Sequence, residues 1–162
     1  MPHGSRHQLL QKGKRATEFT LPRLDGGAIS LSEITAKGPA LLAFFKVNCP
    51  VCQMTFPFLE RIQSPERLPV YGVSQNCAED TRDFNRHFRL TLPMLLDTEA
   101  SGFPVSNAFG ISSVPTLFLI EPDGTVSQVS EGWHKGDIAR FGARAGVDPF
   151  RPTDSVPEAK AG

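Results

Sequence analysis

The sequence has little cysteine, no long apolar stretch and no block of like charge. Its 17 basic residues balance 17 acidic ones, and no run of five like charges occurs, so we expect no nucleic-acid partner and no membrane partner. No segment approaches the roughly 20 apolar residues that a membrane-spanning helix needs. The function must therefore be sought in local motifs rather than in bulk charge or hydrophobicity.

The first 15 residues are polar and contain no apolar stretch of the roughly 7–15 residues typical of a secretory signal. We therefore expect a cytoplasmic protein, in which thiols stay reduced and structural disulfides are rare. The chain has only three cysteines, and two of them, Cys49 and Cys52, are closely spaced. In a reducing compartment such a pair indicates metal binding or redox chemistry rather than a structural crosslink.

Length and composition suit one globular domain, with 40% hydrophobic and 21% charged residues among 162. We expect this domain to span residues 16–147. The polar residues 1–15 are predicted to be flexible. Residues 148–162 contain three prolines and little to bury, so they are predicted to form a tail.

Strand and helix patterns alternate along the domain. The apolar runs at residues 40–47 and 68–74 are typical of strands buried on both faces of a parallel sheet, and helical patterns follow at residues 50–63 and 78–88. The other predicted elements are a hairpin around Asp25-Gly26-Gly27, a short helix capped by Ser32, a strand at 91–97, a helix through 106–110, a hairpin over 116–130 and a helix at 135–145. This order predicts an α/β fold in which helices flank a central mixed β-sheet, with an N-terminal β-hairpin.

Cys49 and Cys52 lie in the stretch FFKVNCPVCQM, where the predicted buried strand ends and the predicted helix begins. Three residues apart in a first helical turn, they share one face and can form a small disulfide. The free N–H groups and the helix dipole at Cys49 favour a thiolate and are expected to lower its pKa from about 8.5 into the range of roughly 3.5–7.5. A thiolate is the nucleophile of thiol–disulfide exchange, and Cys52 is then the resolving thiol.

Two other interpretations of the pair remain open. A zinc site needs four ligands, and only Cys77 and four scattered histidines remain to complete one. Alternatively, two core cysteines have fallen at this spacing by chance. Redox chemistry is favoured over both, and we expect no metal and no cofactor.

Pro115 supplies a second anchor, because it immediately precedes the apolar stretch TLFLI. A proline at the entry of a buried strand is either a simple strand start or a cis proline that holds a loop against an active site. Beside an upstream strand, Cys-x-x-Cys and helix, the second interpretation is favoured.

Taken together, these motifs resemble the thioredoxin superfamily, and within it the redoxin group, related to AhpC/TSA proteins, that includes the TlpA-like thiol–disulfide oxidoreductases. The resemblance covers about residues 17–141 and rests on four stretches in the expected order: FTLPRLDGGAISLSEI, CPVC with Pro57 five residues later, VYGVS, and VPTLFLIEPDGTV.

This resemblance implies a thioredoxin-like fold in which Cys49 attacks, Cys52 resolves and Pro115 is cis. The backbone of Val114 would pair with an extended substrate, so that recognition is mostly by main chain. The predicted substrate-binding residues are Pro50, Val51, Val114 and Pro115. The expected partners are a protein disulfide or dithiol and an electron donor such as a thioredoxin or a low-molecular-weight thiol. We expect a monomer or a weak dimer.

The sequence departs from its relatives at the residues that usually accept a proton from the second cysteine. Thioredoxins bury an aspartate at the position of Ala43, and many TlpA-like proteins have a glutamate at the position of Thr55. Lys46, three residues before Cys49, either helps to hold a thiolate or simply faces solvent. The direction of the reaction therefore stays open.

Two rival functions share this fold. Peroxiredoxins carry the nucleophile in Pro-x-x-x-Thr-x-x-Cys, but here Leu42 and Lys46 occupy the proline and threonine positions, and a lysine can only donate hydrogen bonds. A thiol peroxidase that reduces hydroperoxides is therefore the alternative rather than the first prediction. Copper chaperones use Cys-x-x-x-Cys with a distal histidine, whereas His87 and His134 are interpreted as surface residues.

Cys77 follows the second buried strand and begins a helix. Since the carboxyl ends of parallel strands meet at one edge of a sheet, Cys77 can lie on the same rim as Cys49. It is either an accessory thiol or an incidental, partly buried cysteine.

Overall fold

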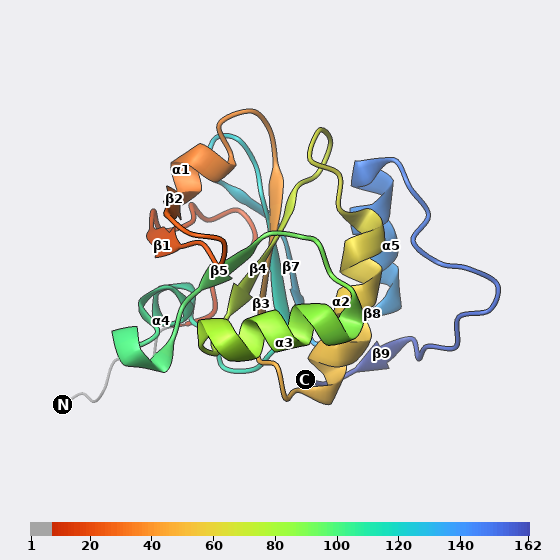
Figure 1. Cartoon of the computed structure of the whole chain (residues 1–162). Helices are drawn as coiled ribbons and strands as arrows, with labels where there is room; N and C mark the ends of the chain where they lie inside the picture. Colours follow the sequence, from red (N-terminus) through yellow and green to blue (C-terminus); the bar gives the residue numbers. More distant parts are fainter. Residues whose placement is uncertain (1–7) are drawn as a thin grey trace.

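A computed structural model describes residues 8–162 and has a five-stranded mixed sheet at its centre, in the order β5-β4-β3-β6-β7 (Figure 1). The first three strands in this order run parallel, and β6 and β7 are each antiparallel to the preceding neighbour. The strands are β3 (Ala40–Phe45), β4 (Val70–Ser74), β5 (Met94–Leu96), β6 (Thr116–Ile120) and β7 (Val126–Glu131). The predicted α/β class with a central mixed sheet is confirmed.

Helices lie on both faces of this sheet, and a small hairpin precedes it. The helices are α1 (Leu31–Ile34), α2 (Pro50–Ile62), α3 (Ala78–Phe88), α4 (Pro104–Phe109) and α5 (Lys135–Ala145), with a 3-10 turn η1 (Glu99–Ser101). The predicted N-terminal hairpin is formed by β1 (Thr20–Pro22) and β2 (Ala28–Ser30), which are antiparallel. A last pair of short strands, β8 (Trp133–His134) and β9 (Ala159–Lys160), joins the end of the chain to the domain.

The apolar run of β3 is continuous because both faces of this strand are covered. Successive side chains of a strand point to opposite faces. Phe45 packs 4.3 Å from Phe56 of α2 and 5.0 Å from Phe84 of α3, while Phe44 packs 5.3 Å from Phe109 of α4, all between ring centroids. Each phenylalanine buried in this way contributes about 1.5–3 kcal/mol to the free energy of unfolding. The core therefore fixes where β3 ends and α2 begins.

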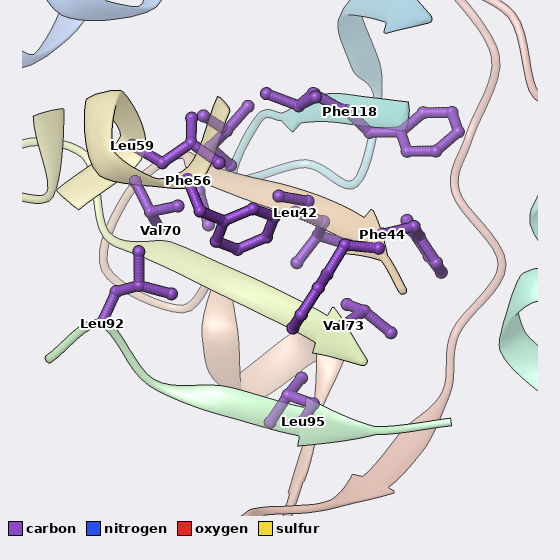
Figure 2. Packing of buried hydrophobic residues seen from close by; sticks show 14 of the residues in the cluster. Leu42, Phe44, Phe56, Leu59, Val70, Val73, Leu92, Leu95 and Phe118 are labelled. Carbon is purple, nitrogen blue, oxygen red and sulfur yellow. The ribbon is translucent and has the colours of Figure 1, made fainter. Parts of the chain in front are cut away.

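Figure 2 shows this packing from close by. Phe56 and Leu59 lie on α2 against the sheet, beside Val70 of β4, while Leu95 of β5, in register with Val73 and Phe44, lies on the other face of the sheet. These side chains are fully buried. Because α2 also contacts α3 and α5, these three helices form one layer over the sheet, and the start of α2 is held rigidly at its edge.

The predicted cap of the first short helix is wrong. Ser30, not Ser32, caps α1: its hydroxyl accepts the N–H of Glu33, and the Glu33 carboxylate accepts the N–H of Ser30. Ser32 instead bonds to the carboxylate of Glu18 through its N–H and its hydroxyl. The reciprocal pair at Ser30 satisfies two free N–H groups at once, which explains why it prevails.

Both stretches that were expected to be loose contact the domain where they are described. The Leu10 N–H donates to the Phe109 carbonyl at the end of α4, and Gly13 and Lys14 exchange hydrogen bonds with Val126 at the start of β7. The first seven residues lie outside the described part of the chain. Residues 148–162, predicted as a tail because they have few side chains to bury, pass beside α2 and α5 and pair with β8 (Figure 1).

Between residues 8 and 162, the structure has no helix with the length and apolar character that crossing a bilayer requires.

Candidate active site

Cys49 lies at the N-terminus of α2, directly after the loop that leaves β3. It is the N-cap residue of this helix, in extended backbone conformation, and Pro50 occupies the first helical position, where no N–H is needed. The Cys49 Sγ accepts the backbone N–H of Cys52 at 3.2 Å. Its thiol in turn donates to the carbonyl oxygen of Val114 at 3.5 Å. The sulfur is partly exposed and is held by polar groups from two distant segments.

Cys52 lies one turn further along α2 and is fully buried. Burial raises the pKa of the Cys52 thiol strongly, and the hydrogen bond with the Cys49 side chain raises it further. A backbone contact with Lys46 and the charge of that residue act in the opposite direction but are weaker. Cys52 therefore stays a neutral thiol while Cys49 meets solvent, which gives the two sulfurs different chemical roles.

The loop between β3 and α2 is braced by two amide side chains. The Val47 N–H donates to the Asn76 Oδ1 at 2.9 Å, and the Gln53 Nε2 donates to the Val47 carbonyl at 2.9 Å. Asn76 stands at the end of β4, beside the end of β3. These residues were missed at the level of sequence, because a lone Asn or Gln carries no pattern. The sequence does place Asn76 directly after a predicted parallel strand. Because neighbouring parallel strands end at the same edge of a sheet, that position could have indicated that Asn76 lies near the loop after β3.

The Val114–Pro115 peptide bond is cis, as the resemblance implied. The carbonyl of Pro115 accepts the N–H of Gly132 at 2.8 Å, which ties the loop before β6 to the end of β7. Val114 and Pro115 are buried, and the Val114 carbonyl faces Cys49. The predicted substrate-binding positions thus fall around one point, with Pro50 exposed and Val51 buried beside the pair.

Neither usual proton acceptor for the second cysteine is present. Ala43 is buried in β3, and Thr55 is buried in α2, where its hydroxyl donates to the Val51 carbonyl at 2.7 Å. Lys46 is exposed. These two positions therefore supply no base for Cys52.

Cys77 is exposed at the N-terminus of α3, at the end of the strand next to β3. Its sulfur makes no capping hydrogen bond to α3. Its part as an accessory thiol stays a prediction. Within residues 8–162, no three side chains of His, Cys, Asp or Glu gather as a metal site.

The end of the chain also reaches this site, which the sequence did not reveal. β9 runs towards the start of α2, and Gly162 lies against the Val114 carbonyl (Figure 1). Tails without apolar periodicity give no signal of where their main chain will pair.

Comparisons with known proteins agree with this fold. A family model described as the AhpC/TSA family matches residues 12–129. Thiol-disulfide oxidoreductase ResA of Halalkalibacterium halodurans is 30% identical over 128 residues, which cover 76% of this chain and 70% of that protein. The thioredoxin domain of a thiol-disulfide oxidoreductase from Bacteroides vulgatus has a TM-score of 0.73 at 20% identity, covering 83% of this chain and 97% of that one. Peroxidoxin BcpB from Mycobacterium tuberculosis has a TM-score of 0.64 at 22% identity, covering 84% and 96%, and shows the fold alone.

Proposed function

Since the chain belongs to the AhpC/TSA family and is a thioredoxin-like thiol–disulfide oxidoreductase, we propose that it exchanges disulfides through Cys49 and Cys52 with a protein or small thiol partner. The observation that carries this proposal is the hydrogen bond from the Cys52 N–H to the Cys49 sulfur at 3.2 Å. This hydrogen bond places the Cys49 sulfur at the N-terminus of α2, beside the free N–H groups of the first turn and partly exposed to a partner.

The exchange proceeds in two steps of thiolate attack. The Cys49 thiolate attacks one sulfur of the partner disulfide, so that a mixed disulfide forms, the partner S–S bond breaks and one partner thiolate leaves. Cys52 then loses its proton and attacks the Cys49 sulfur, which releases the second partner thiolate. The chain ends as a Cys49–Cys52 disulfide and the partner as a dithiol. The reverse sequence oxidises a partner dithiol, and the donor or acceptor for the next turnover is another thiol protein or a small thiol.

Burial of Cys52 supports this order of events. A neutral thiol shielded from solvent cannot compete with Cys49 for the partner, and it becomes reactive only when a mixed disulfide forms directly above it. The loop of Val114 and Pro115 lies on the other side of the Cys49 sulfur, where an extended partner segment would meet main-chain groups.

Trapping of the intermediate tests the proposal. Cys52→Ser should accumulate a mixed disulfide between Cys49 and the partner, because the resolving attack is lost. Cys49→Ser should abolish turnover and trap nothing, and Cys77→Ser shows whether the exposed third thiol takes part in the exchange. Non-reducing gels and mass spectrometry of the linked peptides identify the bond. If Cys52→Ser traps no partner and turns over normally, the assignment of the two cysteines is wrong.

A further inference from the structure

The last residues of the chain follow an extended path beside the candidate site. β9 pairs antiparallel with β8, so that Lys160 lies opposite Trp133 and Ala159 opposite His134. The N–H of Lys135 also donates to the Glu158 carbonyl at 2.9 Å. We refer to residues 157–162 as the C-terminal strap. Its side chains are exposed, so it is held by its main chain.

The end of the strap lies against the groups that hold Cys49. A Cβ placed on Gly162 would overlap the Val114 carbonyl oxygen and approach the Pro115 Cδ to 3.2 Å. A Cβ placed on Gly132 would lie 2.6 Å from the Lys160 carbonyl oxygen. The strap therefore touches both the Val114 carbonyl, which accepts the Cys49 thiol, and Gly132, which donates to the Pro115 carbonyl.

The base of the strap is anchored much more firmly than its end. Trp133 is fully buried, contacts Phe58 and Phe150, and donates its indole N–H to the Pro157 carbonyl at 2.7 Å. The Arg61 guanidinium bonds to both carboxylate oxygens of Asp154, at 2.8 and 3.2 Å. Beyond Glu158, the contacts that the structure shows within residues 8–162 are the main-chain pairing with β8 and the close approaches of Lys160 and Gly162. The strap can therefore open at its end while its base stays in place.

We propose that residues 159–162 occupy the positions beside β8 and Val114 along which an extended segment of a protein partner binds, and that the partner must displace them to reach Cys49. This inference rests on the proposed exchange function. Main-chain pairing at β8 and contact at Val114 are what an added strand would use, and the chain itself supplies such a strand. Small disulfides need no such pairing and reach the partly exposed sulfur directly. The strap thus selects protein partners by how well their main chain competes with residues 159–162 for pairing with β8 and for contact with Val114.

Truncation after Glu158 tests the strap while it keeps the contacts of Asp154, Pro157 and Glu158. With a protein disulfide such as insulin, kcat/KM should rise about tenfold, the change expected if the strap is closed in about nine molecules of ten. With 2,2′-dithiodipyridine the rate should change less than about twofold, since this reagent does not compete with the strap. Lys160→Ala, which keeps the main-chain pairing, is the control and should match the unmodified chain. Equal changes for both substrates, or a loss with insulin, would overturn the proposal.

The rate at which Cys49 is alkylated tests, independently of catalysis, whether the strap limits access to its sulfur. In a Cys77→Ser background, the truncated chain should react faster with a bulky polyethylene-glycol maleimide but equally fast with iodoacetamide. Identical ratios of the two rates in the full and truncated chains would reject the strap. If neither chain exchanges disulfides while the alkylation ratios differ, the strap stands and the proposed exchange function fails.

Discussion

The sulfur of Cys49 lies 3.5 Å from the carbonyl oxygen of Val114, although 65 residues separate the two in the sequence. The contact exists because β3 and β6 are antiparallel neighbours, so the end of β3 and the start of β6 meet at one edge of the sheet. The nucleophile and the segment that would align a partner are therefore placed by the same two buried strands. Their separation therefore depends on the core as well as on the hydrogen bonds that brace the two loops.

Loosening the loop before Cys49 should slow exchange. Asn76→Ala removes the acceptor of the Val47 N–H, which leaves a partly buried donor unpaired at a cost of about 1 kcal/mol in the free energy of unfolding. Since a reacting group must be held closely, we expect exchange to slow by about tenfold. Urea unfolding and the rate of insulin reduction measure the two effects. Asn107→Ala, which removes an exposed side-chain bond to the Gly102 carbonyl, is the matched control. Equal rates in both variants would show that the loop needs no brace.

The stability of the reduced protein should fall in alkaline solution because of Cys52. Burial raises its pKa in the folded state, so at high pH the unfolded chain loses the proton while the folded chain keeps it. The contribution of the protonated Cys52 thiol to the free energy of unfolding is fully present below the unfolded-state pKa of about 8.5. It is lost as the pH rises above that value, by up to about 1.4 kcal/mol per pH unit. Urea unfolding between pH 7 and pH 10 under reducing conditions measures the slope.

A variant without the buried thiol isolates this effect. Cys52→Ala removes one titrating group and leaves Cys49, Cys77 and Lys46 in place, so its stability should fall less steeply above about pH 8.5. Parallel slopes for the two proteins would mean that the Cys52 thiol ionises normally in the folded state.

The elements that the sequence predicted best are those with a strong local signal. The run from Ala40 to Phe45 has no polar residue, which only a strand covered on both faces tolerates, and α3 and α5 begin and end where their patterns do. The position of Cys49 at a helix start followed from Pro50 in the same way. The cap of α1 was misassigned because Ser30 and Ser32 are both good caps, and the choice depends on where Glu33 and Glu18 point.

The C-terminal segment shows what local patterns leave out. Its hydrogen bonds to Trp133 and Lys135 come from the carbonyls of Pro157 and Glu158, and main-chain groups are the same in every residue. Phe150 and Asp154 did carry a signal, but their partners Phe58 and Arg61 lie about 90 residues away. The sequence does not show that α2 passes beside residues 148–162. The three prolines of this segment therefore indicated only a loose tail.

Removing the anchor at the base of the strap should loosen the strand pairing at its end. In Asp154→Ala, Arg61 loses its carboxylate partner, and we expect severalfold faster amide hydrogen exchange at residues 133–135 and 159–160. Because Arg61 lowers the pKa of Asp154, the anchor is present above the ordinary aspartate value of about 3.9 and is lost as the pH falls through the lowered one. The unmodified chain should therefore approach the variant in acid. Asp83→Ala, on the exposed face of α3, should leave these amides unchanged.

Peroxide should oxidise Cys49 no faster than it oxidises an ordinary free thiol. The position where peroxiredoxins place a threonine holds Lys46, whose side chain is exposed and can only donate, and Leu42 is buried in β3. No hydroxyl from this segment can therefore both donate to and accept from the peroxide beside the sulfur. Stopped-flow mixing of the reduced chain with one equivalent of hydrogen peroxide, followed by mass spectrometry of the Cys49–Cys52 bond, measures the rate against free cysteine at the same pH. Complete oxidation within seconds at micromolar peroxide would instead make the chain a thiol peroxidase, with Cys52 resolving a sulfenic acid on Cys49.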